Sequence, residues 1–283
     1  MTRSNFIASI FLVSAIALGF ASFWYYRETI FSKEILTLKI LSQSSAEIGD
    51  EIEYVVEYKN NGNFILENPK IIFELPENSL TEDEKVRFVQ DLDDVHPNSG
   101  DILKFKGRLL GKEGDIKIAK ASLSYVPRNL SARYESETTF NTEISVVPII
   151  FKVNLPQETE GGKEMTYSVD YLSNIDYPLE NLAIKVDDSD KFTFKSSNPN
   201  SLDGSEWKIN VLNKDQGGSI IIKGDVSIEA GELNLLAKIG LWRNGSFVVI
   251  KETKANTRII KPTVEVLSES VNNQTGSMEV INQ

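Results

Sequence analysis

Two patterns of hydrophobic and polar residues divide the chain. From Phe6 to Tyr26 the residues form an apolar run without a charged side chain. After it, segments such as Ile52–Lys59 alternate apolar and polar residues one by one, the period of a β-strand with one buried face. The remainder shows no sustained helical period. The pattern therefore predicts one N-terminal helix followed by an all-β region.

The apolar run predicts a transmembrane anchor over residues 6–26, because about 20 apolar residues in a helix cross the hydrocarbon core of a bilayer. It ends in the aromatic cluster Phe23–Tyr26, which suits the headgroup region, before Arg27 returns the chain to water. Residues 1–5 are expected to form a short cytoplasmic tail, too short for a domain. This topology places the polar remainder outside the cell, as a single-pass protein of the cell membrane.

The run is open to two other interpretations, a cleaved signal peptide and a buried core helix. Gly19-Phe20-Ala21 before Ser22 resembles a mediocre signal-peptide cleavage site. The run exceeds the usual 7–15 residues of a signal core, however, and its aromatic end would serve no purpose once removed. A buried core helix would need a helical partner that the rest of the chain does not provide. The pattern favours an uncleaved anchor.

Comparison of the chain with itself shows a repeat. A shift of 113 residues places GDEIEYVVEYKNNGNFILENPKIIF, from Gly49, over GKEMTYSVDYLSNIDYPLENLAIKV, from Gly162. Ten of the 25 aligned positions are identical. They are Gly49/Gly162, Glu51/Glu164, Tyr54/Tyr167, Val56/Val169, Tyr58/Tyr171, Asn61/Asn174, Leu66/Leu179, Glu67/Glu180, Asn68/Asn181 and Ile71/Ile184.

A second block aligns at a shift of 117, and loops of different length separate the two blocks. It pairs Lys106-Gly107 with Lys223-Gly224, Gly114 with Gly231, and Tyr125 with Trp242. The sequence therefore predicts two copies of one unit, over residues 35–147 and 148–261. Residues 262–283, beginning PTVEVLSES, are expected to be the start of a third copy or a C-terminal tail.

Each copy reads as a series of short strands separated by turns. In the first, Ile52, Tyr54, Val56 and Tyr58 form the apolar face, and the acidic residues between them form a wet face. Asn244-Gly245 predicts a tight type I′ hairpin, and Thr81 with Glu84 predicts a short helical turn within 80–89. About seven strands in some 110 residues indicate an immunoglobulin-like sandwich. Further strands are predicted at 70–75, 102–109, 116–125, 136–144, 220–228, 233–242 and 247–251.

The strand that opens each copy carries a family resemblance. Gly49-Asp50, Tyr54, Asn61-Gly62-Asn63 and Leu75-Pro76 resemble the conserved repeat of bacterial surface proteins, and also the cell-adhesion-related (CARDB) modules. The second copy keeps Gly162, Tyr167 and Asn174 but has Lys163 and Ile175 in place of Asp50 and Gly62. The resemblance covers about residues 36–261. It implies a tandem extracellular stalk on a prokaryotic envelope, without catalytic residues to transfer.

Composition narrows the functional classes. The chain has 283 residues, 41 acidic and 30 basic, and a net charge of −11, which argues against nucleic-acid binding. Because cysteine is absent, disulfides, thiolate metal sites and cysteine nucleophiles are excluded. Nucleophilic catalysis usually needs a base, and the single histidine, His96, lies in a polar loop without a nucleophile elbow. No cofactor is expected.

Two acidic loops are candidate calcium sites. Neither has the spacing of an EF-hand or a repeat-in-toxin motif, and solvated turns are the favoured interpretation. Asn-x-Ser/Thr sequons at Asn129, Asn244 and Asn273 are attributed to chance in a prokaryotic chain. The candidate calcium ligands are Asp91, Asp93, Asp94, Asp187, Asp188 and Asp190.

The sequence thus predicts a membrane-anchored extracellular protein that acts as a stalk, spacer or adhesion module. Its partners would be the bilayer, through residues 6–26, and an unidentified protein or cell-surface component. The alternative is an accessory structural subunit that binds partner proteins laterally in an envelope assembly or secretion complex. An enzyme is the interpretation that the residues support least.

Overall fold

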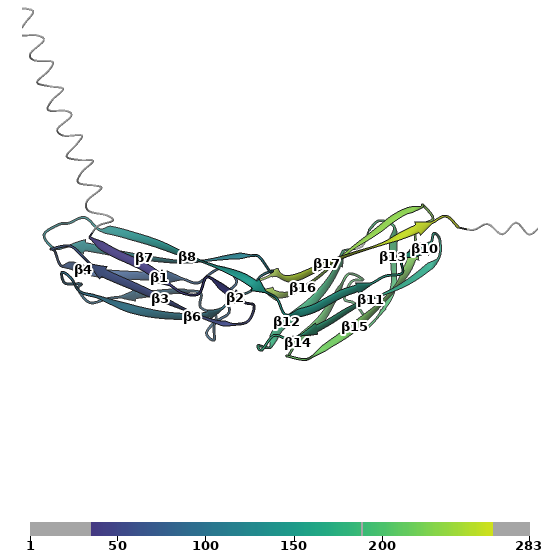
Figure 1. Ribbon diagram of the computed structural model, residues 1–283, viewed down its shortest axis with the longest axis horizontal. Coiled ribbons are helices and arrows are strands. Elements are labelled where there is room, and N and C mark those ends of the chain that lie inside the picture. The colour runs from purple at the N-terminus through teal and green to yellow at the C-terminus, as the bar shows by residue number, and fades with distance from the viewer. Residues whose placement is uncertain (1–34, 188, 263–283) are drawn as a thin grey trace, which may run out of the picture.

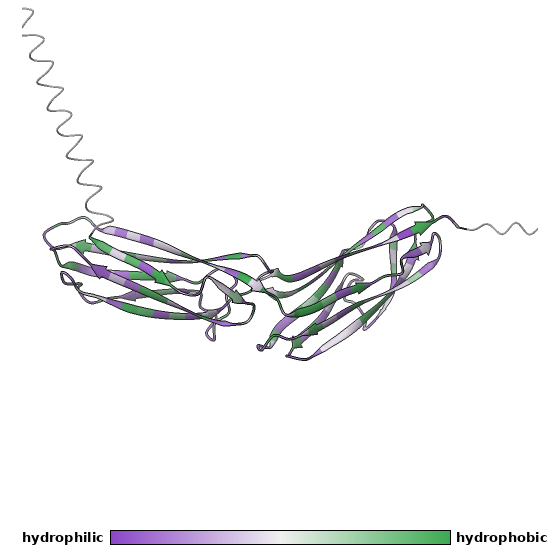
Figure 2. Cartoon of the chain, viewed as in Figure 1, coloured by the Kyte–Doolittle hydropathy of each residue, from purple (hydrophilic) through white to green (hydrophobic). Residues whose placement is uncertain are grey.

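A computed structural model describes residues 35–187 and 189–262, and these residues form 17 strands. Within them there is no helix of a length and apolarity that would cross a bilayer. The predicted tail over 1–5, the anchor over 6–26 and the last 21 residues of the predicted third copy, 263–283, lie outside this description. The described part is all-β, as the alternation of polar and apolar residues predicted (Figure 2).

The first eight strands form two sheets that face each other, the first sandwich. The smaller sheet has the order β1-β3-β6 and the larger the order β2-β8-β7-β4-β5. Strand β2 runs parallel to β8, whereas the other neighbours are antiparallel. The strands are β1 (Leu36–Leu41), β2 (Ser45–Glu47), β3 (Glu51–Asn60), β4 (Leu66–Glu74), β5 (Arg87–Asp91), β6 (Gly100–Arg108), β7 (Ile116–Pro127) and β8 (Tyr134–Val146).

The other nine strands form the second sandwich in the same way. Its sheets have the orders β13-β15-β11-β9 and β10-β17-β16-β12-β14, and β10 runs parallel to β17. The strands are β9 (Ile149–Asn154), β10 (Glu158–Glu160), β11 (Glu164–Ser173), β12 (Leu179–Asp187), β13 (Phe192–Asn198), β14 (Glu206–Leu212), β15 (Gly217–Val226), β16 (Gly231–Arg243) and β17 (Ser246–Ile260).

Both sandwiches follow the immunoglobulin-like plan. The first strand moves from one sheet to the other, its second part lies beside the last strand, and the sheets pack through their inner faces. Figure 1 shows the two sandwiches end to end. The purple start of β1 lies near the outer end of the first, and the yellow end of β17 near the outer end of the second.

Strand registers correct one pair of the sequence alignment. Tyr125 is fully buried, whereas Trp242 points to the outer face of its sheet and is only half-buried. Ile71 pairs with Leu123 across β4 and β7, and its counterpart Ile184 pairs with Ile239 across β12 and β16. Continued along the strands, this register makes Leu241, not Trp242, the counterpart of Tyr125. The shift of 117 is correct for β6 and β15 but one residue too long here.

The opening stretch from Gly49 to Asn63 is a structural element in both sandwiches. Gly49 and Gly162 both adopt a positive φ, at 88° and 78°, in the turn before the strand. Tyr54 and Tyr167 are buried in the two cores, and burial raises the pKa of the Tyr54 hydroxyl. The acidic residues between the core positions face solvent, as the sequence predicted.

The retained glutamates at the start of these strands form ion pairs. Glu51 lies 2.9 Å from Lys106, whose hydrogen bond and charge lower the pKa of the carboxyl group. Glu164 lies 3.5 Å from Lys195 on β13. Both pairs are exposed, so each contributes little to stability. They account for the acid that both copies keep at this position.

Two turn predictions have different outcomes. The Asn244-Gly245 hairpin is confirmed, because both residues have positive φ and Arg243 pairs with Ser246. The helical turn within 80–89 is wrong. The Thr81 hydroxyl donates to the carbonyl of Lys85 at 2.9 Å instead of capping a helix.

Replacement of Asn60 by alanine is expected to cost about 3 kcal/mol of stability in the first sandwich. Asn60 is fully buried, and its amide donates to the carbonyls of Phe64 and Val95 at 2.7 and 2.9 Å. Its side-chain oxygen accepts a hydrogen bond from the Gly62 amide at 2.9 Å. Urea unfolding with a conformational probe measures the loss.

Ser173 supplies the control for Asn60, since it occupies the same place in β11 and is also fully buried. Its hydroxyl accepts one hydrogen bond, from the Ile175 amide at 3.2 Å. Ser173→Ala is therefore expected to cost about 1 kcal/mol. Equal losses in the two variants would contradict the role given to Asn60.

Candidate functional site: the junction between the sandwiches

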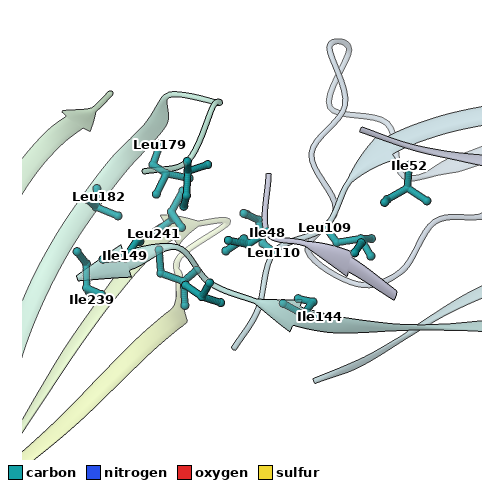
Figure 3. Close-up of a cluster of buried hydrophobic side chains, with 14 of the residues drawn as sticks. Ile48, Ile52, Leu109, Leu110, Ile144, Ile149, Leu179, Leu182, Ile239 and Leu241 are labelled. Carbon is teal, nitrogen blue, oxygen red and sulfur yellow. The ribbon is translucent and has the colours of Figure 1, made fainter. Parts of the chain in front are cut away.

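The two sandwiches meet through buried apolar side chains. In Figure 3, Ile48 and Leu110 of the first sandwich face Leu241 and Ile149 of the second, with Leu109 behind them, and all five belong to one buried apolar cluster. Each of these five side chains is at most 3% exposed. Burial of apolar surface stabilises an interface by about 25 cal/mol per Å². The junction is therefore a packed interface rather than a loose linker.

A close backbone approach lies at the centre of this interface. A β-carbon built on Gly49 would come within 2.7 Å of the Ile175 side chain, closer than real β-carbons approach. Ile175 is itself 2% exposed. The second copy has this isoleucine at the position of Gly62, so its departure from the repeat signature supplies a contact between the sandwiches.

Arg108 connects the same two regions. Its guanidinium carbon lies 4.7 Å from the centroid of the Tyr177 ring, a cation–π contact from the first sandwich to the second. One of its amino groups also donates to the Gly49 carbonyl at 2.7 Å. The arginine thus holds the turn at Gly49 and the partner ring together.

Polar contacts also lie at the junction. The Lys251 ammonium donates to the carbonyl of Val147 at 3.0 Å, next to the connection between β8 and β9. Lys112 and Glu252 form an exposed ion pair at 3.7 Å, which contributes little by itself. Only Val147 and Pro148 separate β8 from β9. The proline ring restricts this connection, which contains no glycine, so the sandwiches have little freedom to bend.

A hollow of about 400 Å³ lies along the junction. The loop after β4 forms one wall, and β12, the chain before it and the end of β16 form the other. Tyr177 and Trp242 provide its aromatic surface. It is lined by Leu80, Thr81, Glu82, Glu84, Tyr177, Pro178, Glu180, Asn181, Leu241, Trp242, Arg243 and Asn244.

Trp242 is the centre of a polar and aromatic cluster on the outer face of the second sandwich. Its indole nitrogen donates to Glu206 at 2.7 Å, and the Lys185 ammonium lies 4.3 Å from the centroid of its ring system. Lys185 also lies 3.2 Å from Glu206 and 4.9 Å from the Phe247 ring. A second hollow of about 420 Å³ adjoins the hollow at the junction, and Trp242 and Asn181 line both.

The sequence did not single out this cluster, since it paired Trp242 with the buried Tyr125. The alternation within β16 carried a usable signal. Leu235, Ala237, Ile239 and Leu241 point inward, so Trp242 must point outward. The outward positions Ile72 and Val89 of the first sandwich correspond in register to Lys185 and Glu206. The second sandwich therefore carries an ion pair where the first is apolar.

The candidate calcium ligands lie in two separate regions of the described chain. Asp91 pairs with Lys70 at 3.5 Å, and Asp94 accepts a hydrogen bond from the Asn68 amide at 3.2 Å. Asp93 lies near Tyr58, whose pKa is raised by burial and by the charges of Asp101 and Asp93. All three carboxylates are exposed in the first sandwich.

The second group lies at the end of β12. Asp187 pairs with Lys238 at 2.5 Å, Asp190 is exposed on the turn before β13, and Asp188 lies outside the described residues. The described residues contain no group of three or more His, Cys, Asp or Glu side chains arranged to hold a metal ion. His96 is exposed in its loop, and its carbonyl accepts hydrogen bonds from the amide and hydroxyl of Ser99.

No family model matches the chain, and a search of curated proteins returned no match. Among solved structures it resembles red sea bream transglutaminase, with a TM-score of 0.38 and 13% identity over 84% of this chain and 33% of that one. A second similar structure is trypsin-activated α2-macroglobulin from Escherichia coli. Its TM-score is 0.32, with 10% identity over 79% of this chain and 18% of that one. The chain therefore spans a third or less of these two proteins.

A third similar structure is the C-terminal domain of the Streptococcus pyogenes antigen I/II-family protein AspA. Its TM-score is 0.33, with 9% identity, 80% coverage of this chain and 100% of that domain. All three TM-scores are low. These similarities carry no argument about the activity of the chain.

Proposed function

We propose that the chain is a membrane-anchored extracellular spacer, which holds a binding surface at a fixed distance and angle from a prokaryotic envelope. The observation that carries this proposal is the apolar junction, in which Gly49 lies against Ile175. A stiff connection transmits position from one sandwich to the next. In this role the chain acts by geometry rather than by catalysis.

The arrangement of the strands supports the same role. The sandwiches follow one another end to end, so each adds its length to the projection (Figure 1). The connection of Val147 and Pro148 has no flexible Gly/Ser linker. The net charge of −11 suits a surface that remains solvated and repels copies of itself.

The alternative proposal, an accessory subunit of an envelope assembly that binds partners laterally, has its own supporting observation. The outer face of the first sandwich exposes Ile116, Ile118 and Val86 by 54%, 45% and 39%. These side chains line a hollow of about 510 Å³ between β4, β5 and β7. Exposed apolar patches of this kind favour contacts with other proteins.

Fractionation of cells that express the full chain tests the anchor in the proposal. The chain is expected to stay in the membrane pellet after an alkaline wash, because a run of 21 uncharged, mostly apolar residues would hold it in the bilayer. A variant that begins at Arg27 is the control and should appear in the soluble fraction. Release of the full chain by the wash would contradict the proposal.

A further inference from the structure

The two sandwiches differ in one strand. In the second, β15 lies between β11 and β13, so both of its edges are paired. In the first, within the residues that the structure describes, the equivalent strand β6 pairs with β3 alone, at the end of its sheet. The chain between β4 and β5 runs as a loop where the second sandwich has β13. In the described part of the chain, the smaller sheet of the first sandwich therefore has three strands where that of the second has four.

One pair of residues marks where that strand would run. Leu80 and Arg108 exchange both backbone hydrogen bonds at 2.8 Å in an isolated antiparallel bridge. In the second sandwich, Asp225 occupies the position of Arg108 and pairs with Thr193 of β13. Leu80 thus takes the place of Thr193, and the strand does not continue beyond it.

Among residues 35–187 and 189–262, backbone donors and acceptors on the open side of β6 have no strand partner. Since Arg108 directs its amide and carbonyl toward Leu80, the alternation of an antiparallel strand directs those of Lys106, Lys104 and Ile102 the same way. The Ile102 amide donates instead to the carboxylate of its neighbour Asp101 at 2.8 Å. In the second sandwich, the counterpart of Lys106 is Lys223, which pairs with Ser196 of β13. The counterpart of Lys104 is Ile221, which pairs with Asn198.

The inward side chains next to this edge are incompletely buried. Leu103 and Phe105 point inward from β6 but are only half-buried. Their counterparts Ile220 and Ile222, beside β13, are fully buried. Phe105 stacks on Phe73 at 4.3 Å and contacts Phe88 at 5.2 Å. An added strand with an apolar inward side chain would cover these rings.

The charges along the edge indicate the partner. Solvent-facing positions of β6 hold Lys104, Lys106 and Arg108, whereas β15 has Ile221, Lys223 and Asp225. In the second sandwich, Lys195 of β13 pairs with Asp225 at 2.6 Å. In the first sandwich Arg108 stands in the place of that aspartate, opposite Leu80. Lys104 and Lys106 lie 2.9 Å from Glu53 and Glu51 of β3, and on their other side the outward positions of an added strand would face this row of cations and favour acids.

We propose that the open edge of β6, from Ile102 to Lys106, binds an extended segment of a partner protein as a fourth, antiparallel strand. The segment has apolar side chains at the inward positions and acidic side chains at the outward ones. Main-chain hydrogen bonds hold such a strand, and alternate side chains select it. Edge lysines also serve in other proteins to prevent such pairing, so charge selection is the decisive property to test.

Fluorescence anisotropy with the full chain and a labelled synthetic peptide tests the proposal. The peptide has seven residues, the length of β13, with alternating Glu and Phe. It is expected to bind with a Kd below about 1 mM. The same peptide methylated at the backbone nitrogens that face β6 cannot donate to the edge, and its binding is expected to be at least about tenfold weaker.

Variants of the edge separate backbone from charge. Lys104→Pro removes an amide that points away from β3 and should abolish binding while thermal unfolding changes little. Lys104→Ala removes the same charge but keeps the amide, so it should weaken binding only about threefold. The double variant Lys104→Glu and Lys106→Glu should favour a peptide with lysines in place of the glutamates by about tenfold.

Several outcomes would overturn the proposal. The first is that the methylated and unmethylated peptides bind equally well. The second is that the unmethylated peptide does not bind at concentrations up to 1 mM. The third is that the double variant keeps the preference for the glutamate peptide over the lysine peptide. Concentration-dependent self-association that the peptide competes with would show that a second copy, not a different protein, occupies the edge. These outcomes do not depend on the membrane anchor, so they are distinguishable from failure of the spacer proposal.

Discussion

Replacement of Trp207 by alanine is expected to lower the free energy of unfolding of the second sandwich by about 4 kcal/mol. Trp207 is the largest fully buried side chain of the described residues, at 1% exposure. Its indole nitrogen donates to the Ser197 hydroxyl at 3.0 Å and to the Pro199 carbonyl at 3.2 Å. The substitution leaves both a cavity and unpaired acceptors between the sheets.

For a domain of this size, such a loss corresponds to a fall in melting temperature of about 15 °C, measured by calorimetry. Trp242→Ala is the matched control, because it removes the same side chain from a half-buried outward position. Its cost is expected to be about 1 kcal/mol. A fall of less than about 5 °C for Trp207→Ala would contradict the assigned core.

Gly49→Val is expected to have the largest effect on the junction, at about 3 kcal/mol. Two physical terms contribute. A β-branched residue is strained at the φ of 88°, and its β-carbon would collide with Ile175 of the other sandwich. The first term destabilises the turn, and the second separates the sandwiches. Unfolding in urea measures the sum.

Gly162→Val separates these two terms. Gly162 lies in the equivalent turn of the second sandwich with a φ of 78°, and an added β-carbon would meet only the Ile228 side chain, at 3.4 Å. The variant should therefore show the backbone strain, about 2 kcal/mol, without a change in the angle between the sandwiches. If both variants change the angle equally, the contact at Gly49 does not hold the junction.

The sequence predicted the parts of the fold that depend on local pattern. The alternation of Ile52, Tyr54, Val56 and Tyr58 identified a buried face, because side chains alternate across a strand whatever it packs against. The repeat of Gly49 at Gly162 located two equivalent turns. Asn68 and Asn181 also proved equivalent, with positive φ in β4 and β12.

Registers and missing strands were harder to predict from one sequence. The pairing of Tyr125 with Trp242 was one residue out of register, and a shift of one reverses inward and outward side chains. The loop from 75 to 86 and the strand β13 occupy equivalent positions, although their sequences share no pattern. The difference depends on which backbone groups find a partner across the sheet.

The junction could not be predicted, because its contacts join residues far apart in the sequence. Ile175 looked like a loss of the turn glycine, since Gly62 holds that position in the first copy. In the structure, its side chain packs against Gly49 across the interface. The cluster around Trp242 could not be predicted for a related reason, because Lys185 and Glu206 come from two different strands.

The distance between spin labels on the two sandwiches tests the central claim of a rigid two-domain spacer most directly. The chain has no cysteine, so Lys59→Cys and Lys208→Cys introduce the only two labelling sites, both exposed. Pulsed electron paramagnetic resonance should give one narrow distance distribution, which Gly49→Val broadens and Gly162→Val leaves unchanged. A broad distribution in the otherwise unaltered chain would contradict the rigid junction.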